Sequence, residues 1–235
     1  PKTGAEEERR NRYADIYWHS RERRGIQQID AQKLMRERNY FAAMMVNEGE
    51  ADALVSGHSQ SYPTVVRPMM QLIGKAPGIS LIATTNMMMT NRGPIFLSDT
   101  AINPLPTADD LAKIALMTAK TVRMFGMDPV IAMVSYSNFG SSAHDSASKV
   151  REAVAYLHKY YPDLSVDGEL QADFALNSEM LKNKFPFSKV ARKKVNTLIF
   201  PNLEAANITY KLLKELNETE SIGPIMMGMD KPVHI

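Results

Sequence analysis

Residues 128–142 read Asp-Pro-Val-Ile-Ala-Met-Val-Ser-Tyr-Ser-Asn-Phe-Gly-Ser-Ser, and they decide the fold class. Residues 130–134 form a continuous apolar run of strand length, which is typical of a strand buried on both faces. A polar loop with one glycine follows, and then Val150, Val154 and Leu157 repeat at helical spacing. The stretch therefore predicts a strand, a loop and a helix of the kind that builds parallel sheets, and so an α/β fold.

The same pattern recurs later in the chain. Residues 196–200 form a second apolar strand, and after a polar turn a helix is predicted through Tyr210 and Leu213. Repeated units of this kind imply right-handed crossovers, with ligand sites at the carboxyl ends of the strands.

Three further elements fit this alternation of helices and strands. Residues 31–47 are predicted as one helix with an apolar face, and residues 53–56 as a short strand that leads into a loop. The clearest helix begins at Thr107, where Thr-Ala-Asp-Asp matches a capping box, and it ends at Gly126.

Composition excludes several classes of protein. The 235 residues, 44% of them hydrophobic, suit one globular unit that has room for two lobes. A net charge of +2 is too small to indicate a nucleic-acid partner, and no apolar run has the length of a membrane span. We therefore expect neither nucleic acid nor membrane as a partner. Because the chain has no cysteine, we expect a cytoplasmic protein without disulfides or thiolate chemistry.

Common cofactor motifs are also missing from the sequence. No glycine-rich dinucleotide fingerprint or P-loop occurs, and the five histidines have no metal-ligand spacing. We therefore expect no metal and no nicotinamide cofactor in this chain. Since the sequence starts at Pro1 without a methionine, we expect a piece of a longer polypeptide.

Three groups of residues can carry chemistry, and each has a structural alternative. The hydroxyls of the 135–142 loop can cradle a phosphate, or they can cap the following helix and satisfy a turn. The acids Asp167, Glu169 and Asp173 can handle protons, or they can act as turn and cap residues. The 16 methionines can line an acyl channel or fill the core.

Several motifs, in the same order, resemble the phosphate acetyl/butyryl transferase family. The matching stretches are residues 49–57, 66–68, 99–104, 135–137, 167–173, 200–205 and 223–224. Within that family the chain looks most like the carboxyl-terminal domain of the large bacterial NADP-dependent malic enzymes, because of residues 17–18, 23–25, 137–142, 204–206 and 231–234.

The resemblance implies a two-lobed α/β/α sandwich of the isocitrate and isopropylmalate dehydrogenase-like type, in which the first strand-helix unit of lobe 1 is missing. Lobe 1 is expected at residues 1–103 plus 225–235, and lobe 2 at residues 104–224. Family members commonly pair through the second lobe, so a dimer or a higher homo-oligomer is expected through lobe 2.

The resemblance also implies a cleft for acyl-CoA or phosphate. Its residues are Arg67, Ser137, Asn138, Gly140, Ser141, Ser142, Asn207, Tyr210, Gly223, Met226, Met227 and Gly228. Ser137, Gly140 and Ser141 would contact the polar head of the ligand, Arg67 a phosphate or carbonyl, and Met226 or Met227 the acyl arm.

The family's transferases join acetyl phosphate to coenzyme A, but the chain departs from their pattern. Residues 232–235 read Pro-Val-His-Ile in place of Pro-Val-Asn-Asp, no Ser-Arg follows, and Glu215 stands where the transferases place an arginine. An anion at a phosphate site opposes binding. The main hypothesis is therefore a regulatory and oligomerisation domain of a malic enzyme, with acetyl-CoA as effector in a relic cleft.

In that hypothesis the malic enzyme's catalytic domain is joined in cis. That domain would decarboxylate malate to pyruvate, and it alone would hold NADP and a divalent metal. Two alternatives stay open. One is a catalytic phosphate acetyltransferase with acetyl-CoA as substrate, and the other is a ligand-free dimerisation scaffold.

Overall fold

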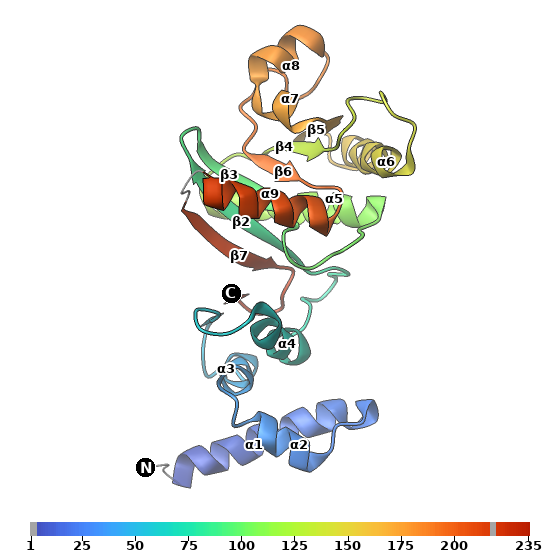
Figure 1. The fold of residues 1–235 in the computed structure, drawn as a ribbon. Coiled ribbons are helices and arrows are strands. Elements are labelled where there is room, and N and C mark those ends of the chain that lie inside the picture. Colours follow the sequence, from blue (N-terminus) through green and yellow to red (C-terminus); the bar gives the residue numbers. More distant parts are fainter. Residues whose placement is uncertain (1–3, 217–219) are drawn as a thin grey trace. The chain divides into compact units, whose positions relative to one another are not determined.

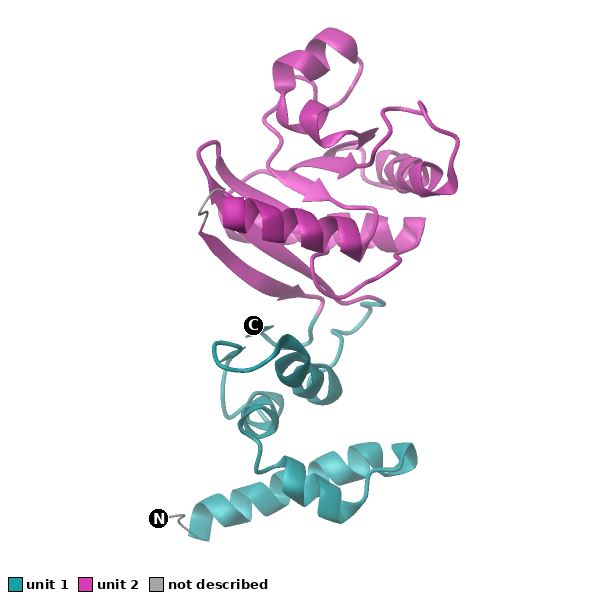
Figure 2. Ribbon diagram, in the orientation of Figure 1, with its two compact units in different colours: residues 1–80, 229–235 teal, residues 81–228 magenta. Residues whose placement is uncertain are grey.

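The computed structural model describes residues 4–216 and 220–235, and the chain divides into two compact units. Unit 1 comprises residues 1–80 and 229–235, and unit 2 comprises residues 81–228 (Figure 2). Each unit has its own hydrophobic core.

Unit 1 is helical apart from one short pair of strands. The elements are α1 Gly4–Arg21, the 3-10 helix η1 Glu22–Arg24, α2 Gln28–Leu34, α3 Arg38–Asn47, β1 Leu54–Val55, α4 Tyr62–Leu72 and β8 Val233–His234. Strand β1 pairs in parallel with β8, so the carboxyl-terminal segment closes this unit. Tyr17 and Tyr40 pack in its core, and both hydroxyls donate to Gln71 Oε1, at 3.0 and 2.8 Å.

The single helix predicted at residues 31–47 is wrong, because the structure breaks it into α2 and α3. Glu37 has extended backbone angles and begins a new helix. The break lets Met35 of the turn and Met44 of α3 be buried in the same cluster, which one straight helix with this spacing would not allow.

Unit 2 is built on a six-stranded mixed sheet with the order β5-β4-β6-β3-β2-β7 (Figure 1). The strands are β2 Ala83–Thr90, β3 Gly93–Ser98, β4 Val130–Val134, β5 Ser165–Leu170, β6 Thr197–Ile199 and β7 Ser221–Met227. Strands β3, β6, β4 and β5 run parallel, while β2 is antiparallel to both of its neighbours. The predicted strand at residues 130–134 is confirmed.

Helices cover both faces of this sheet. The helices are α5 Ala108–Met124, α6 Asp145–Tyr160, α7 Ala172–Leu176, α8 Ser178–Lys184 and α9 Leu203–Leu216. Ile131 and Met133 of β4 pack with α5 and α6, whereas Ala132 and Val134 pack with α7, α8 and α9. Because side chains alternate along a strand, a strand between two helical layers must be apolar throughout.

The capping box predicted for α5 is confirmed. The Thr107 hydroxyl accepts a hydrogen bond from Asp110 N, and Thr107 N donates to Asp110 Oδ2 at 3.0 Å. The helix ends at Met124, and Gly126 follows with a φ of 74°.

The two units differ from the predicted lobes. Residues 81–103 belong to unit 2, since β2 and β3 are hydrogen-bonded into its sheet, and β7 joins the same sheet up to Met227. The likeness to isocitrate dehydrogenase-type lobes, including the missing first strand-helix unit, stays a prediction.

Candidate functional site

The 135–142 loop lies at the carboxyl end of β4, beside the end of β5. Ser135 N donates to Leu170 O at 2.8 Å, and Phe139 N donates to Glu169 O at 2.9 Å. Phe139 and Gly140 have φ values of 45° and 88°, which turn the chain back toward α6. The end of β5 therefore holds the loop at the carboxyl edge of the sheet.

The side chain of Glu169 forms hydrogen bonds with this loop. Its side chain is fully buried, and Oε1 accepts hydrogen bonds from Ser137 Oγ at 2.8 Å, Gly140 N at 2.8 Å and Arg151 at 2.7 Å. Arg151 of α6 also donates to Ser142 O at 2.9 Å. A buried carboxylate needs such partners, so Glu169 and Arg151 tie the loop to the helix.

The hydroxyls of the loop are used mainly within the loop. Ser137 is 1% exposed, and its hydroxyl bonds Ser141 Oγ at 2.9 Å and accepts from Ser142 N at 3.0 Å. Gly140 and Ser141 are exposed. The turn-forming alternative thus describes what the serines do in this structure, and ligand contact by Ser137, Ser141 and Ser142 stays a prediction.

Asn138 has a structural partner as well. Its Oδ1 accepts from Gln171 N at 2.8 Å, and its Nδ2 donates to Gln171 Oε1 at 2.6 Å. This pairing joins the loop to the start of α7. An asparagine in this place is therefore explained by loop geometry and does not identify a regulatory protein.

The other acids of the predicted cluster are separated. Asp167 lies within β5 and is buried, and its carboxylate accepts from Gly168 N at 3.0 Å and Lys189 N at 2.7 Å, so it has a structural role in the strand. Asp173 is exposed in the first turn of α7. Only Glu169 of the three contacts the 135–142 loop among the contacts found in residues 4–216 and 220–235.

A pocket of about 350 Å³ opens at this carboxyl edge. Its wall includes Val134 at the end of β4, Ser135 directly after it, Phe200 and Asn202 after β6, and Ser146 of α6. Asn202 and Ser146 were not predicted from the sequence. The signal was present, because both stand directly after a strand or at the start of a helix, where ligands of α/β proteins bind.

Two helices begin beside this pocket. His144 Nδ1 accepts from Ser146 N at 3.3 Å at the start of α6, and Asn202 Oδ1 accepts from Ala205 N at 2.8 Å at the start of α9. The positive ends of both helix dipoles therefore face the carboxyl edge, which favours an anion there.

Lys149 places a cation close to the same edge. Its Nζ donates to Pro201 O at 2.9 Å, and burial lowers the pKa of its ammonium group. Like the helix termini, this group favours a negative charge in the pocket.

The remaining predicted residues lie elsewhere. Asn207 donates to Thr100 O at 3.0 Å, and Tyr210 is packed in the core with its hydroxyl 3.4 Å from Ser221 Oγ. Met226 and Met227 are buried in β7, and Met227 packs in the core below α5. This burial agrees with the use of methionine as core filler.

Strand positions separate the loop from the predicted residues of β7. Gly223 and Gly228 flank or lie in β7, which is four positions from β4 in the sheet, or roughly 19 Å at usual strand spacing. Arg67 belongs to α4 of unit 1 and is exposed. The structure thus brings together Ser137, Asn138, Gly140, Ser141 and Ser142, and it places the β7 residues away from them.

No group of three or more histidine, cysteine, aspartate or glutamate side chains in residues 4–216 and 220–235 could hold a metal ion. No helix within these same ranges has the length and apolar character needed to cross a membrane.

Comparison with known proteins shows the family. The family model described as phosphate acetyl/butaryl transferase matches residues 2–235, and the chain belongs to this family. It is 39% identical over 234 residues to a phosphate acetyltransferase of Thermoanaerobacterium thermosaccharolyticum, covering 97% of this chain and 71% of that protein.

Two further relatives define what the fold resembles. A crystal structure of a phosphotransacetylase from Streptococcus pyogenes superposes with a TM-score of 0.85 at 40% identity, covering 94% of this chain and 68% of that chain. An NADP-dependent malic enzyme of Salmonella typhimurium is 39% identical over 225 residues, covering 95% of this chain but only 30% of that protein.

These relatives correct the predicted function. The main hypothesis, a regulatory and oligomerisation domain of a malic enzyme, is contradicted, because proteins named phosphate acetyltransferase match almost the whole chain equally well and solved neighbours are phosphotransacetylases. The findings favour the alternative of a catalytic phosphate acetyltransferase. The motifs taken as typical of malic enzymes include the Asn138 loop, whose contacts are structural.

Proposed function

We propose that this chain belongs to a phosphate acetyltransferase, which transfers an acetyl group between acetyl phosphate and coenzyme A. The observation that carries the proposal is the match of nearly the whole chain, in sequence and in fold, to proteins of that name. In this proposal acetyl-CoA is a substrate, and no NADP or metal takes part in this domain.

The proposed reaction balances as a single acyl transfer. The thiolate sulfur of coenzyme A bonds to the carbonyl carbon, the bond from that carbon to the phosphate oxygen breaks, and phosphate leaves with the electron pair. The thiol proton passes to a base or to water. Catalysis then requires groups that hold an anion and stabilise the negative oxygen of the transition state.

The carboxyl-edge pocket has groups of this kind. The amino ends of α6 and α9, together with Lys149, favour the phosphate of the substrate. We propose that the exposed part of the 135–142 loop, at Gly140 and Ser141, contacts the polar head of the ligand. A phosphate contact by Arg67, which belongs to unit 1, stays a prediction from the family resemblance and is tested by itself below.

The test is a spectrophotometric assay of thioester formation from acetyl phosphate and coenzyme A, with the protein that carries this chain. We expect turnover that depends on both substrates. Arg67→Ala should raise the KM for acetyl phosphate about tenfold or more, as expected for loss of one charge-assisted contact. The exposed Arg36→Ala in the same unit is the matched control and should leave the KM unchanged.

Two results would contradict these expectations. If the folded protein forms no thioester above background at saturating substrates, the proposed activity is wrong. Equal effects of Arg67→Ala and Arg36→Ala would remove Arg67 from the site while leaving the activity in place.

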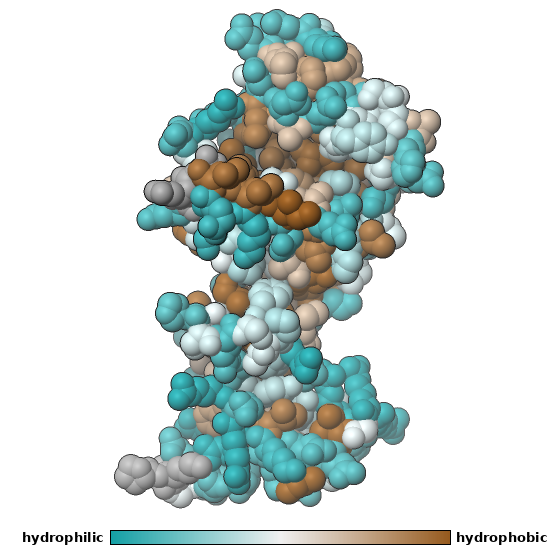
Figure 3. Space-filling model, in the orientation of Figure 1, coloured by the Kyte–Doolittle hydropathy of each residue, from teal (hydrophilic) through white to brown (hydrophobic). Residues whose placement is uncertain are grey.

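We also propose that copies of the chain pair through residues 104–224. Helix α9 exposes Ile208, Leu212 and Leu216, with exposed fractions of 58, 54 and 77%, at a spacing of one helical turn (Figure 3). An apolar stripe of this kind supports a protein interface. Leu212→Glu should reduce the mass measured by light scattering to that of a monomer, and an unchanged mass would contradict pairing through α9.

A cytoplasmic location stays a prediction.

A further inference from the structure

Unit 2 has a second hollow at the opposite edge of its sheet. Two adjoining pockets of about 570 and 790 Å³ share Arg92, Ile95 and Leu176 in their walls. They lie where β3 and β4 begin and where Asn196 leads into β6. We call this hollow the amino-edge groove. Because β4 is five residues long, the groove is about 15 Å from the carboxyl-edge pocket.

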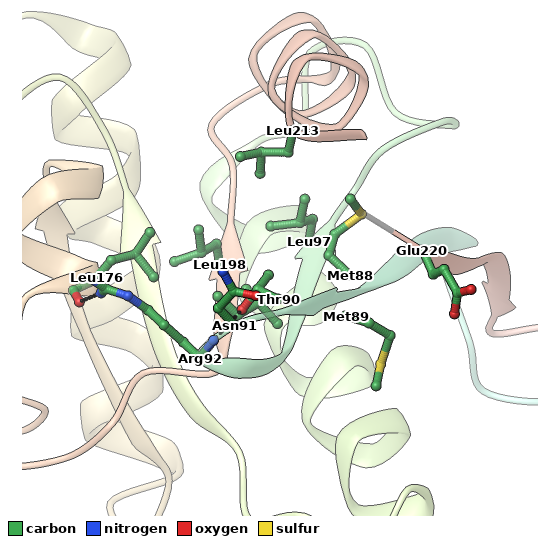
Figure 4. A pocket seen from close by; sticks show the side chains of 11 residues that line it. Met88, Met89, Thr90, Asn91, Arg92, Leu97, Leu176, Leu198, Leu213 and Glu220 are labelled. Carbon is green, nitrogen blue, oxygen red and sulfur yellow. Dashed lines mark hydrogen bonds between the residues drawn. The ribbon is translucent and has the colours of Figure 1, made fainter. Parts of the chain in front are cut away.

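The groove has an apolar floor. Leu97 is fully buried and Ile95 is 9% exposed, and both come from β3. Figure 4 shows Leu213 of α9 over Leu97 and Leu198, with Leu176 at the end of the groove near Arg92. Such a floor favours the aliphatic part of a ligand over a small hydrated ion.

Cations stand at the mouth of the groove. The guanidinium of Arg92 donates to Leu176 O (Figure 4). Arg92 lines both pockets. Lys194 Nζ lies 3.9 Å from where a Cβ on Gly93 would be. Gly93 follows Arg92 in the chain, and Arg92 and Lys194 both line the larger pocket. Lys193 lines the same pocket and donates to Ser165 Oγ at 2.6 Å.

Two carboxylates border the groove, one at each pocket. Asp128 lines the larger pocket, and Glu220 lines the smaller one. Among the described residues of the larger pocket, three cations oppose one carboxylate. The mouth therefore attracts anions, while the floor excludes water from an apolar chain.

From this combination we infer that the amino-edge groove binds an aliphatic carboxylate. The carboxylate lies at Arg92 and Lys194, where a planar guanidinium can pair with two oxygens, and the chain lies along Ile95 and Leu176. The site goes beyond the proposed acyl transfer, because it uses none of the residues of the carboxyl edge. A ligand there acts on the transferase only through the sheet that joins the two edges.

Calorimetric titration of the protein with hexanoate, octanoate and decanoate tests the inference. We expect saturable binding that strengthens about fourfold for each added methylene group, as burial of an aliphatic chain requires. Inorganic phosphate, which has charge but no chain, should not bind at this site. The change Arg92→Ala with Lys194→Ala should weaken octanoate binding about tenfold.

Two controls keep the test decisive. Lys120→Ala removes an exposed cation from α5 and should leave the affinity unchanged. Lys194→Glu reverses one exposed charge and keeps the Arg92 hydrogen bond. This single variant should also weaken octanoate binding, and it replaces the double variant as the test if the double variant does not fold. Absence of octanoate binding, an affinity independent of chain length, or equal losses in Lys120→Ala and Lys194→Glu would each overturn the inference.

Discussion

Replacement of Glu169 by glutamine tests the central contact of the 135–142 loop. The change keeps the size of the side chain and removes its charge, and with it the ion pair to Arg151 at 2.7 Å. Loss of one member of a fully buried pair costs about 3–5 kcal/mol. Since the Arg151 side chain is 33% exposed, water can hydrate its unpaired guanidinium in part, which reduces this cost. We therefore expect the free energy of unfolding to fall by about 2–3 kcal/mol.

Urea unfolding followed by far-ultraviolet circular dichroism measures this loss. Glu152→Gln, an exposed position on the same helix as Arg151, is the matched control and should change stability by less than about 0.5 kcal/mol. A double-mutant cycle with Arg151→Met should show a coupling of about 1–2 kcal/mol. The reasoning about this contact is wrong if Glu169→Gln lowers stability no more than Glu152→Gln does. It is also wrong if the effects of Glu169→Gln and Arg151→Met simply add in the double mutant.

Three further changes test other parts of the fold. Gly168→Ala should destabilise the protein by about 3 kcal/mol or more, because an added Cβ would lie 2.5 Å from Met133 O; Gly126→Ala, which meets no neighbour within 4 Å, should cost only about 1–2 kcal/mol in urea unfolding. Thr107→Ala should lower the unfolding free energy by about 1 kcal/mol through loss of the α5 cap, and an unchanged midpoint would contradict the cap. Burial lowers the pKa of His234, so its unfolded form binds protons more readily; stability should fall as the pH drops below about 6.5, and unfolding midpoints should show a weaker fall in His234→Gln.

Strands β4 and β6 of unit 2 could be predicted because their apolar runs are continuous. Val130 to Val134 contact helices on both faces of the sheet, so every position is apolar and the pattern cannot be confused with a half-exposed strand. The helix at residues 31–47 was mispredicted because its apolar spacing continues across Glu37, where only the backbone angles show the break.

The candidate site was predictable in position but not in detail. A glycine loop after a buried strand indicates the carboxyl edge from sequence alone. The full burial of Glu169 next to this loop depends on Arg151 of α6, because Arg151 pairs with the buried carboxylate. Arg151 reaches Glu169 only when α6 packs on the sheet. The order of strands likewise decides that β7 is far from β4, and no local pattern contains that order.

The two ends of unit 2 leave from neighbouring strands, since Ala83 of β2 is paired with Met227 of β7. Residues 81 and 228 are thus close together, although 147 positions separate them along the chain. Unit 2 is therefore an insert within unit 1, and a single proteolytic cut at either junction leaves the two units covalently joined. A short linker between these ends, combined with new ends opened in an exposed loop, would give a circularly permuted unit 2 with its sheet order intact.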